Sequence, residues 1–190
     1  MLTRPYPLHL LNAALLIGLW GGSLWAYPHL PGEIPMHYGL SGAADRFAET
    51  TLGRWLTLPL VATLTAGITY GGAALVRALP GALSVPSPHF DALNDAGRQR
   101  VAVSVQVVLS GIATLVLVLF GALQGGNYVV ATQSLSALPG WVDLAIWGSI
   151  AAILAVTVGF AVYSRRLVER LARQPAFTDP NPSSADHATT

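Results

Sequence analysis

The fold is decided by the stretch Val101–Val142, which reads VAVSVQVVLSGIATLVLVLFGALQGGNYVVATQSLSALPGWV and holds no charged residue. A helix that crosses the hydrocarbon core of a bilayer needs about 20 consecutive, mostly apolar residues, and this stretch exceeds that length. Three more uncharged stretches lie before and after it, namely Pro5–Gly32, Trp55–Val76 and Leu144–Ser164. Together they predict four membrane-spanning helices.

The composition points the same way. Of the 190 residues, 53% are hydrophobic and 10% are charged, whereas about 25% of an average soluble domain is charged. This deficit argues against a soluble enzyme and against a disordered chain. The net charge of +1 offers no basic field for phosphates, so we expect no nucleic-acid partner. The chain has no Cys, which excludes disulfides and thiolate chemistry, and we expect no cofactor.

The first span is predicted at His9–Tyr27. A cleaved signal peptide is the alternative, but its apolar core would have about 7–15 residues and would end at a small-x-small cleavage site. The run here is longer, and Leu24–Trp25–Ala26 fits that site poorly. We therefore expect a retained helix.

The second span is predicted at Trp55–Val76. Pro59 either kinks this helix or lies in its first turns. Gly67 and Gly71 form a small-xxx-small pair, which lets another helix approach closely. We expect this pair to pack within the chain rather than to form a dimer.

The 42-residue uncharged stretch is too long for one span, and its second half changes in composition. Gln124–Gly140 is rich in Gly, Asn, Gln, Ser and Pro, which favour loops. We therefore place the third span at about Val101–Leu123 and the fourth at about Val142–Tyr163. The predicted units are a first helix pair in residues 1–78, a connecting loop in 79–100, a second pair in 101–164, and a largely disordered tail in 165–190.

The arginines predict the orientation, because short cytoplasmic segments carry an excess of basic residues. With the N-terminus inside, only Arg46 and Arg54 lie outside. The inside segments then hold Arg4, Arg77, Arg98, Arg100, Arg165, Arg166, Arg170 and Arg173. We therefore expect both termini in the cytoplasm and residues 28–54 on the outer face. The predicted class is an all-α integral membrane protein with four transmembrane helices and an ordered extracytoplasmic loop between helices 1 and 2.

Residues 28–55, PHLPGEIPMHYGLSGAADRFAETTLGRW, carry most of the polar side chains outside the inner segments. Their prolines forbid a continuous helix, so we expect Ile34–Tyr38 to be extended and Ser41–Gly42 to form a tight turn. Thr50 or Thr51 is placed to cap the second span. A short hairpin-like cap over the outer helix ends is predicted.

A metal site in this loop is disfavoured. His29, Glu33 and His37 share a helical spacing, but the prolines remove the helix. His37, Asp45 and Glu49 could converge in a folded loop, yet nothing in the sequence requires it, and zinc needs three or four converging ligands. His37 is more often a hydrogen-bonding group or a pH sensor than a catalyst. The sequence holds no recognisable catalytic arrangement, so we expect no enzyme.

Polar side chains within the spans favour packing over transport. No ionisable group lies at depth, which disfavours a proton-coupled transporter. Gln106, Ser110 and Thr114 lie on one face of the third span at i, i+4 and i+8, where interhelical hydrogen bonds are expected. Asp143 begins the fourth span, within plausible reach of Arg46 or Arg54.

The loop also carries a family resemblance. From Leu30 to Phe47 the pattern L-P-x-x-I-P-M-H-Y-x-x-S-G-x-A-D-R-F resembles a bacterial membrane domain of unknown function, number 1648, as found in the N-terminal part of SdpI-type immunity proteins. Tyr38 stands where that family usually has Phe or Trp, and Gly39 where it has Asn or Asp. The resemblance covers about Leu15–Leu64. The matching positions are Pro31, Ile34, Pro35, His37, Gly42, Asp45 and Arg46.

The resemblance implies a protein of the bacterial cell membrane that meets a secreted peptide, or senses one, through its outward loop. The seven matching positions are then the candidate recognition residues or the frame that holds them. The expected partners are the lipid bilayer and a secreted peptide or another membrane protein. The alternative is an accessory subunit of a larger membrane complex or transporter, suggested by the glycines of the spans.

Overall fold

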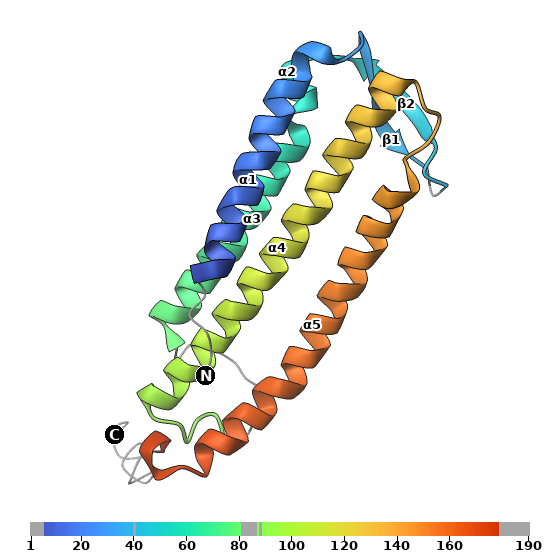
Figure 1. Ribbon diagram of the computed structural model, residues 1–190. Coiled ribbons are helices and arrows are strands. Elements are labelled where there is room, and N and C mark those ends of the chain that lie inside the picture. Colours follow the sequence, from blue (N-terminus) through green and yellow to red (C-terminus); the bar gives the residue numbers. More distant parts are fainter. Residues whose placement is uncertain (1–5, 40, 81–86, 88, 179–190) are drawn as a thin grey trace, which may run out of the picture.

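The computed structural model describes residues 6–39, 41–80, 87 and 89–178. Four long helices lie side by side and form an elongated bundle (Figure 1); they are α1 Tyr6–Ala26, α3 Thr57–Ala78, α4 Asp95–Gln133 and α5 Gly140–Ala172. The short elements are η1 Tyr27–His29, β1 Glu33–Tyr38, β2 Ala44–Glu49, α2 Leu52–Trp55 and η3 Pro175–Phe177. Each of the four long helices is apolar and long enough to cross a membrane, which suggests a membrane protein.

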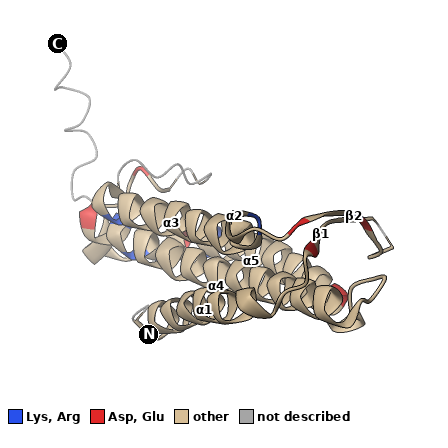
Figure 2. Ribbon diagram, turned by 90° about the horizontal axis from the view of Figure 1, so that it is seen from above, with Lys and Arg blue, Asp and Glu red and all other residues tan. Residues whose placement is uncertain are grey.

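The class is mostly helical rather than all-α. β1 and β2 pair in a two-stranded antiparallel sheet at one end of the bundle, here called the hairpin end. The N-terminal end of α4 and the C-terminal end of α5 lie at the opposite end (Figure 1), here called the arginine end. The arginines gather mostly at that opposite end when the molecule is viewed from above (Figure 2).

Helix α4 is the centre of the bundle. It packs against α1, α3 and α5, and it also contacts β1 and η3. Helix α5 packs mainly on α4 and stands away from α1 and α3 (Figure 1). The position of the hairpin therefore depends on α4 more than on any other helix.

The sequence-based bounds of α4 were wrong at both ends. The helix begins at Asp95, inside the predicted loop 79–100, because the Asn94 side chain caps it by accepting a hydrogen bond from Gly97 N at 3.0 Å. It continues to Gln133 through the predicted loop Gln124–Gly140, of which only the last part connects the helices. Ser134 ends it in the left-handed conformation, with φ of 52°.

The glycines near the end of α4 serve packing. A Cβ added to Gly126 would lie 2.7 Å from Val142 Cγ2, a distance that real Cβ atoms do not reach. A Cβ added to Gly125 would likewise lie 3.4 Å from Cη2 of Trp141. These glycines let α5 approach α4 closely, so their presence marks a helix contact and not a loop.

The start of the second span and the packing of α3 both differ from the prediction. Thr51 caps the short helix α2 by accepting from Arg54 N, whereas α3 begins at Thr57 without a side-chain cap, and Pro59 lies in its first turn. Gly67 and Gly71 are exposed, and a Cβ at either would meet no atom within 4 Å. The packing face of α3 instead uses small buried alanines, namely Ala62, Ala66 and Ala73. The two glycines do not pack within the described chain.

The arginine end is held by an apolar cluster, whose buried members are Phe90, Leu93, Val101, Val168 and Leu171. The segment after α5 joins this cluster, since Asn94 N donates to Phe177 O at 2.9 Å and the Arg100 guanidinium lies 4.3 Å from the centre of the Phe177 ring. The prediction of a disordered tail is therefore wrong for the helical residues 165–172 and for residues 174–178. Residues 179–190 lie outside the described part.

Candidate functional site

The candidate site is the hairpin of β1 and β2. The strands run as predicted, with Ile34–Tyr38 extended. Gly42 N donates to Gly39 O and Gly39 N donates to Ala43 O, both at 2.9 Å, which closes the turn. Gly42 has φ of +76°, a conformation that only Gly adopts at little cost. The predicted tight turn at Ser41–Gly42 is confirmed.

His37 and Asp45 meet across the hairpin. His37 Nδ1 donates to Asp45 Oδ1 at 2.6 Å, and both side chains are more than half exposed. Glu49 pairs with Glu33 at the far end of the ladder. His29 is engaged elsewhere, since its Nδ1 donates to Trp25 O at 2.9 Å. Within the described residues no three His, Asp or Glu side chains come together as metal ligands.

The turn of the hairpin rests on the α4–α5 connection. Ala44 N donates to Ser136 O at 3.0 Å, and Leu138 N donates to Gly42 O at 2.9 Å. Ala43 and Ala137 form an isolated antiparallel bridge between these bonds. The connection therefore covers the start of β2 as a short third strand would. These backbone bonds fix the hairpin to the helices without using its exposed side chains.

The charged residues next to these backbone hydrogen bonds are arranged differently from the prediction. Asp143 lies beside Gly42, where an added Cβ would be 3.9 Å from its Oδ1. In the part of the chain that the structure describes, Asp143 forms no ion pair with Arg46 or Arg54. Arg54 instead donates to Glu49 O at 2.9 Å, and Arg46 is exposed opposite His37.

The inner side of the hairpin is anchored by aromatic residues. Ile34 and Trp55 are each 3% exposed and form a buried cluster with Ala26. Trp55 Nε1 donates to Ser23 O at 2.7 Å, and Gln124 Nε2 donates to Trp55 O at 3.2 Å. Trp55 thus connects α1 through its indole and α4 through its backbone O, and its side chain packs on Ile34 at the base of the hairpin.

Tyr38 makes a second anchor on α4. Its hydroxyl donates to Asn127 Oδ1 at 2.5 Å. Burial raises the pKa of the Tyr38 hydroxyl above its ordinary value, because the charged form loses its solvation. The neutral hydroxyl is therefore the form that holds β1 to α4.

The outer side of the hairpin combines apolar and polar groups. Met36 is 41% exposed and Phe47 is 51% exposed, although both lie outside the four long helices. The strand register shifts between Pro35 and His37, as in a β-bulge, and Met36 lies at this irregularity. Beside these apolar side chains lie the exposed His37 and Arg46. We call these exposed side chains of the strands, taken together, the outer hairpin face; its residues are Met36, His37, Asp45, Arg46 and Phe47, of which Met36 also lines a cavity with Tyr38 and Trp55.

Four of the seven motif positions hold the hairpin in shape, and three present exposed side chains. Ile34 and Pro35 are buried in the inner side, Gly42 forms the turn, and Pro31 O accepts from Thr50 Oγ1 at 2.6 Å. The other three motif positions lie on the outer hairpin face; they are His37, Asp45 and Arg46.

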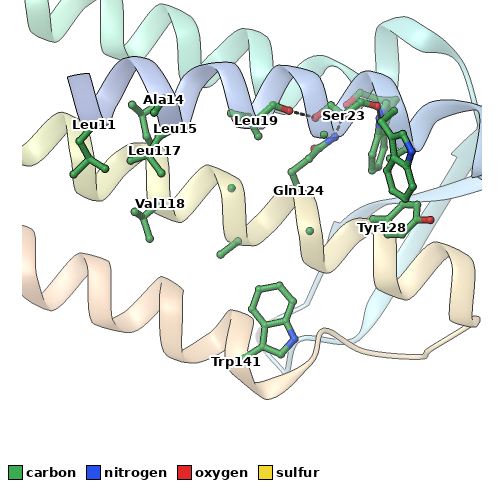
Figure 3. A pocket seen from close by; sticks show the side chains of 18 residues that line it. Leu11, Ala14, Leu15, Leu19, Ser23, Leu117, Val118, Gln124, Tyr128 and Trp141 are labelled. Carbon is green, nitrogen blue, oxygen red and sulfur yellow. Dashed lines mark hydrogen bonds between the residues drawn. The ribbon is translucent and has the colours of Figure 1, made fainter. Parts of the chain in front are cut away.

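A groove runs down the bundle from the hairpin end (Figure 3). It has a volume of about 730 Å³, and its lining comes mainly from α1 and α4, with Trp141 of α5 on one side. Gly18, Gly22 and Gly121 leave its floor open, because nothing lies within 4 Å of a Cβ at any of them. Gln124 lines it, and its Oε1 is buried without a hydrogen-bond partner among the described residues. The remaining lining is almost wholly apolar.

About midway along α4 a polar network joins three helices. Asn12 of α1 donates to Tyr70 OH of α3 at 2.7 Å and to Ser110 O of α4 at 3.0 Å, and it accepts from Thr114 Oγ1 at 2.7 Å. This confirms an interhelical side-chain hydrogen bond for the predicted face at Thr114, whereas Ser110 contributes only its backbone O and its Oγ is buried without a partner among the described residues. Gln106, the third member of that face, makes no side-chain hydrogen bond with a described residue.

Sequence reasoning missed the residues that receive the hairpin. Gln124 and Asn127 were assigned to a loop by composition, and Ser136 and Leu138 act through backbone atoms, which composition does not reveal. The spacing of Gln124 and Asn127 at i and i+3 was the available signal, since it places two amides on one helical face.

Comparison with known proteins identifies one region. Residues 14–63 match the family described as Domain of unknown function (DUF1648). The match begins within α1, contains the hairpin and α2, and ends in the first turns of α3. No curated protein and no solved structure matches the chain. The expected domain resemblance is thereby confirmed over about a quarter of the chain, and it carries no assigned function.

Proposed function

We propose that this chain is a non-enzymatic, multi-pass protein of the bacterial cell membrane that recognises a partner through the outer hairpin face. The observation that carries the proposal is the pair of exposed apolar side chains, Met36 and Phe47, on a hairpin that is hydrogen-bonded to α4 and to the α4–α5 connection. Exposed apolar side chains flanked by polar groups are characteristic of interaction sites. The hairpin presents them on a rigid support, which lowers the entropy lost on binding.

The partner we propose is a secreted peptide, as in SdpI-type immunity proteins. β2 has β1 on one side and no other strand in the described sheet, and the α4–α5 connection covers only its beginning. An extended peptide can add to such an edge by backbone hydrogen bonds. Phe47 and Arg46 would then contact its side chains. This binding mode needs no catalytic group or metal.

The proposed orientation places the hairpin outside the cell and both termini in the cytoplasm. The absence of Cys allows a direct test with single-cysteine variants. Glu49→Cys on the hairpin should react with a membrane-impermeant maleimide in intact cells. Gln174→Cys, exposed after α5, should react only after the cells are opened. The reverse pattern would refute the orientation.

Recognition is tested by survival of toxin-sensitive cells that express the chain. The wild type should protect against a secreted peptide, and the double variant Met36→Ser with Phe47→Ser should lose that protection while its expression and thermal stability stay unchanged. His37→Ala and Asp45→Ala should weaken it. Leu135→Ser, an exposed apolar residue next to the hairpin, is the control and should still protect. Failure of the wild type against every peptide tested would defeat the immunity role.

The second candidate function is an accessory subunit of a larger membrane complex or transporter. It is favoured by the outward face of α3, where Gly67 and Gly71 are exposed with open space above them. Such a pair allows a second helix to approach closely in a membrane. Purification in mild detergent is the test, because a stable partner should copurify with the wild type and be lost with Gly67→Leu. A lone monomer would count against this candidate.

A further inference from the structure

The last turns of α5 carry four arginines on one side of the helix. At about 100° per residue, Arg165, Glu169, Arg173, Arg166 and Arg170 fall in this order within an arc of about 140°. All five are exposed. We call this surface the α5 arginine face; its basic residues are Arg165, Arg166, Arg170 and Arg173.

The opposite side of these turns is fixed in place. Val168 and Leu171 are buried in the apolar cluster of the arginine end, and Leu167 packs against that cluster. η3 folds back onto the same cluster through Phe177. The arginine face is therefore held outward by packing behind it.

The arginines of this end have two different uses. Arg98 donates to Asp91 O at 3.1 Å, and Arg100 covers the Phe177 ring, so both stabilise the fold. The four arginines of α5 make no ion pair and no side-chain hydrogen bond with any residue that the structure describes. Their only acidic neighbour on the face is Glu169, which leaves a surplus of positive charge.

The face lies where lipid headgroups would be. From Trp141 to Ser164 the helix rises by about 35 Å, at about 1.5 Å per residue, which is close to the roughly 30 Å of the hydrocarbon core plus its edges. Arg165 and Arg166 therefore begin at the boundary, and Arg173 lies about two turns further. Long arginine side chains reach sideways to the interface from such positions.

We propose that the α5 arginine face binds the phosphate groups of anionic phospholipids. Arginine presents a planar set of donors that matches phosphate oxygens, and clusters of four or more basic residues beside a membrane helix attract anionic lipid. The positive charge of the arginines is complementary to that of lipid phosphates, and the face lies at the depth of the headgroups. The guanidinium donors make no hydrogen bond within the described chain. This binding is independent of the recognition proposed for the hairpin.

The test compares two short-chain lipids that differ in headgroup charge, added to the full chain in neutral detergent. Dihexanoyl phosphatidylglycerol should bind roughly tenfold more tightly than dihexanoyl phosphatidylcholine, measured by native mass spectrometry or by the rise in Tm. Arg166→Gln with Arg170→Gln should bring the two lipids to similar affinity. The same two positions changed to Lys should keep most of the preference, which separates charge from misfolding.

The matched control removes two arginines at the other end, with Arg46→Gln and Arg54→Gln, and should retain the full preference. Equal affinity of the two lipids for the wild type would overturn the proposal, and so would a preference that survives in the Gln variant of α5. Inorganic phosphate is the third probe. If it displaces the anionic lipid at equal concentration, the face is a free-phosphate site and the lipid assignment is wrong.

Discussion

The two ends of the bundle attach their connecting segments by different means. At the hairpin end, backbone hydrogen bonds with Ser136 and Leu138 hold the hairpin, together with side-chain hydrogen bonds from Trp55 and Tyr38. At the arginine end, Phe177 of η3 packs on the apolar cluster around Leu93, and Asn94 joins η3 to the start of α4 through its backbone N to Phe177 O and its side chain to Ala176 O. Hydrogen bonds are directional, and the hairpin makes them at several points, to α4 and to the α4–α5 connection, whereas η3 makes them to one residue. The difference is suited to a hairpin whose outer face has to be presented in one orientation.

The largest expected effect compares the central residue of each end. Trp55→Ala should lower the free energy of unfolding by about 3–5 kcal/mol, because it empties a buried cluster and leaves Ser23 O without its donor. Leu93→Ala should cost about 2–5 kcal/mol through the cavity alone. Trp141→Ala, half exposed, is the control. Unfolding by denaturant in detergent measures all three. A Trp55 variant as stable as the control would show that the indole does not stabilise the hairpin end.

The next effect concerns two glycines of α4 at points where another segment of the chain packs closely against the helix. Gly126→Ala at the hairpin end should cost about 1–3 kcal/mol, because its Cβ would overlap Val142. Gly97→Ala at the arginine end meets Phe177 O at 3.1 Å and should cost a similar amount. Gly121→Ala has open space and should be neutral or stabilising. Thermal unfolding in detergent distinguishes them. Equal stability of the Gly126 and Gly121 variants would contradict the close contact of α4 with α5.

A smaller effect tests the turn of the hairpin. Gly42→Ala should cost about 1–2 kcal/mol, because φ of +76° is strained for a residue with a Cβ. Gly39→Ala, in the same turn but without a positive φ, should cost well under half as much. Protection of the Leu138 and Ala44 amides from hydrogen exchange should fall in the Gly42 variant and persist in the Gly39 variant. Unchanged protection would show that the conformation of the turn does not determine the hydrogen bonds between the hairpin and the α4–α5 connection.

The smallest effect is a pH dependence confined to the hairpin end. Because the pKa of Tyr38 is raised in the fold, its contribution to stability is fully present below the ordinary value of 10.0 and is lost as the pH rises through the raised pKa. Tyr38→Phe should cost about 1 kcal/mol at neutral pH and should reduce the loss of stability above pH 10. Tyr163→Phe, exposed on α5, is the control and should keep that loss. Midpoints of unfolding across this pH range give the answer.

The sequence predicted the number of long helices and the form of the hairpin. Uncharged runs mark the spans because a charge in a bilayer is expensive, and Gly42 marks a turn because its backbone is permissive. Thr51 is a helix cap for the same kind of local reason, although it caps the short α2 that precedes the second span. Features set by a residue's own backbone or solvation were therefore accessible before the fold was known.

Features set by contact with a distant element were not accessible. Gln124 to Gln133 reads as a loop by composition, yet it is helical because its small and polar residues receive α5 and the hairpin. Gly67 and Gly71 read as a packing pair, yet the alanines on the other side of α3 face the bundle. Within the candidate site, His37 and Asp45 were singled out from the sequence, whereas Asn127 and Ser136 were not. Their partners lie about 90 residues away in the chain.

The length of α4 has a mechanical consequence. Its 39 residues give a rod of about 58 Å, nearly twice the thickness of a hydrocarbon core of about 30 Å. The same rod holds the hairpin at one end and η3 at the other. In the proposed membrane orientation, a bilayer that thins or thickens would leave the distance between the two ends unchanged and would instead tilt the molecule or slide along it. The hairpin would then stay at a set distance from the α5 arginines.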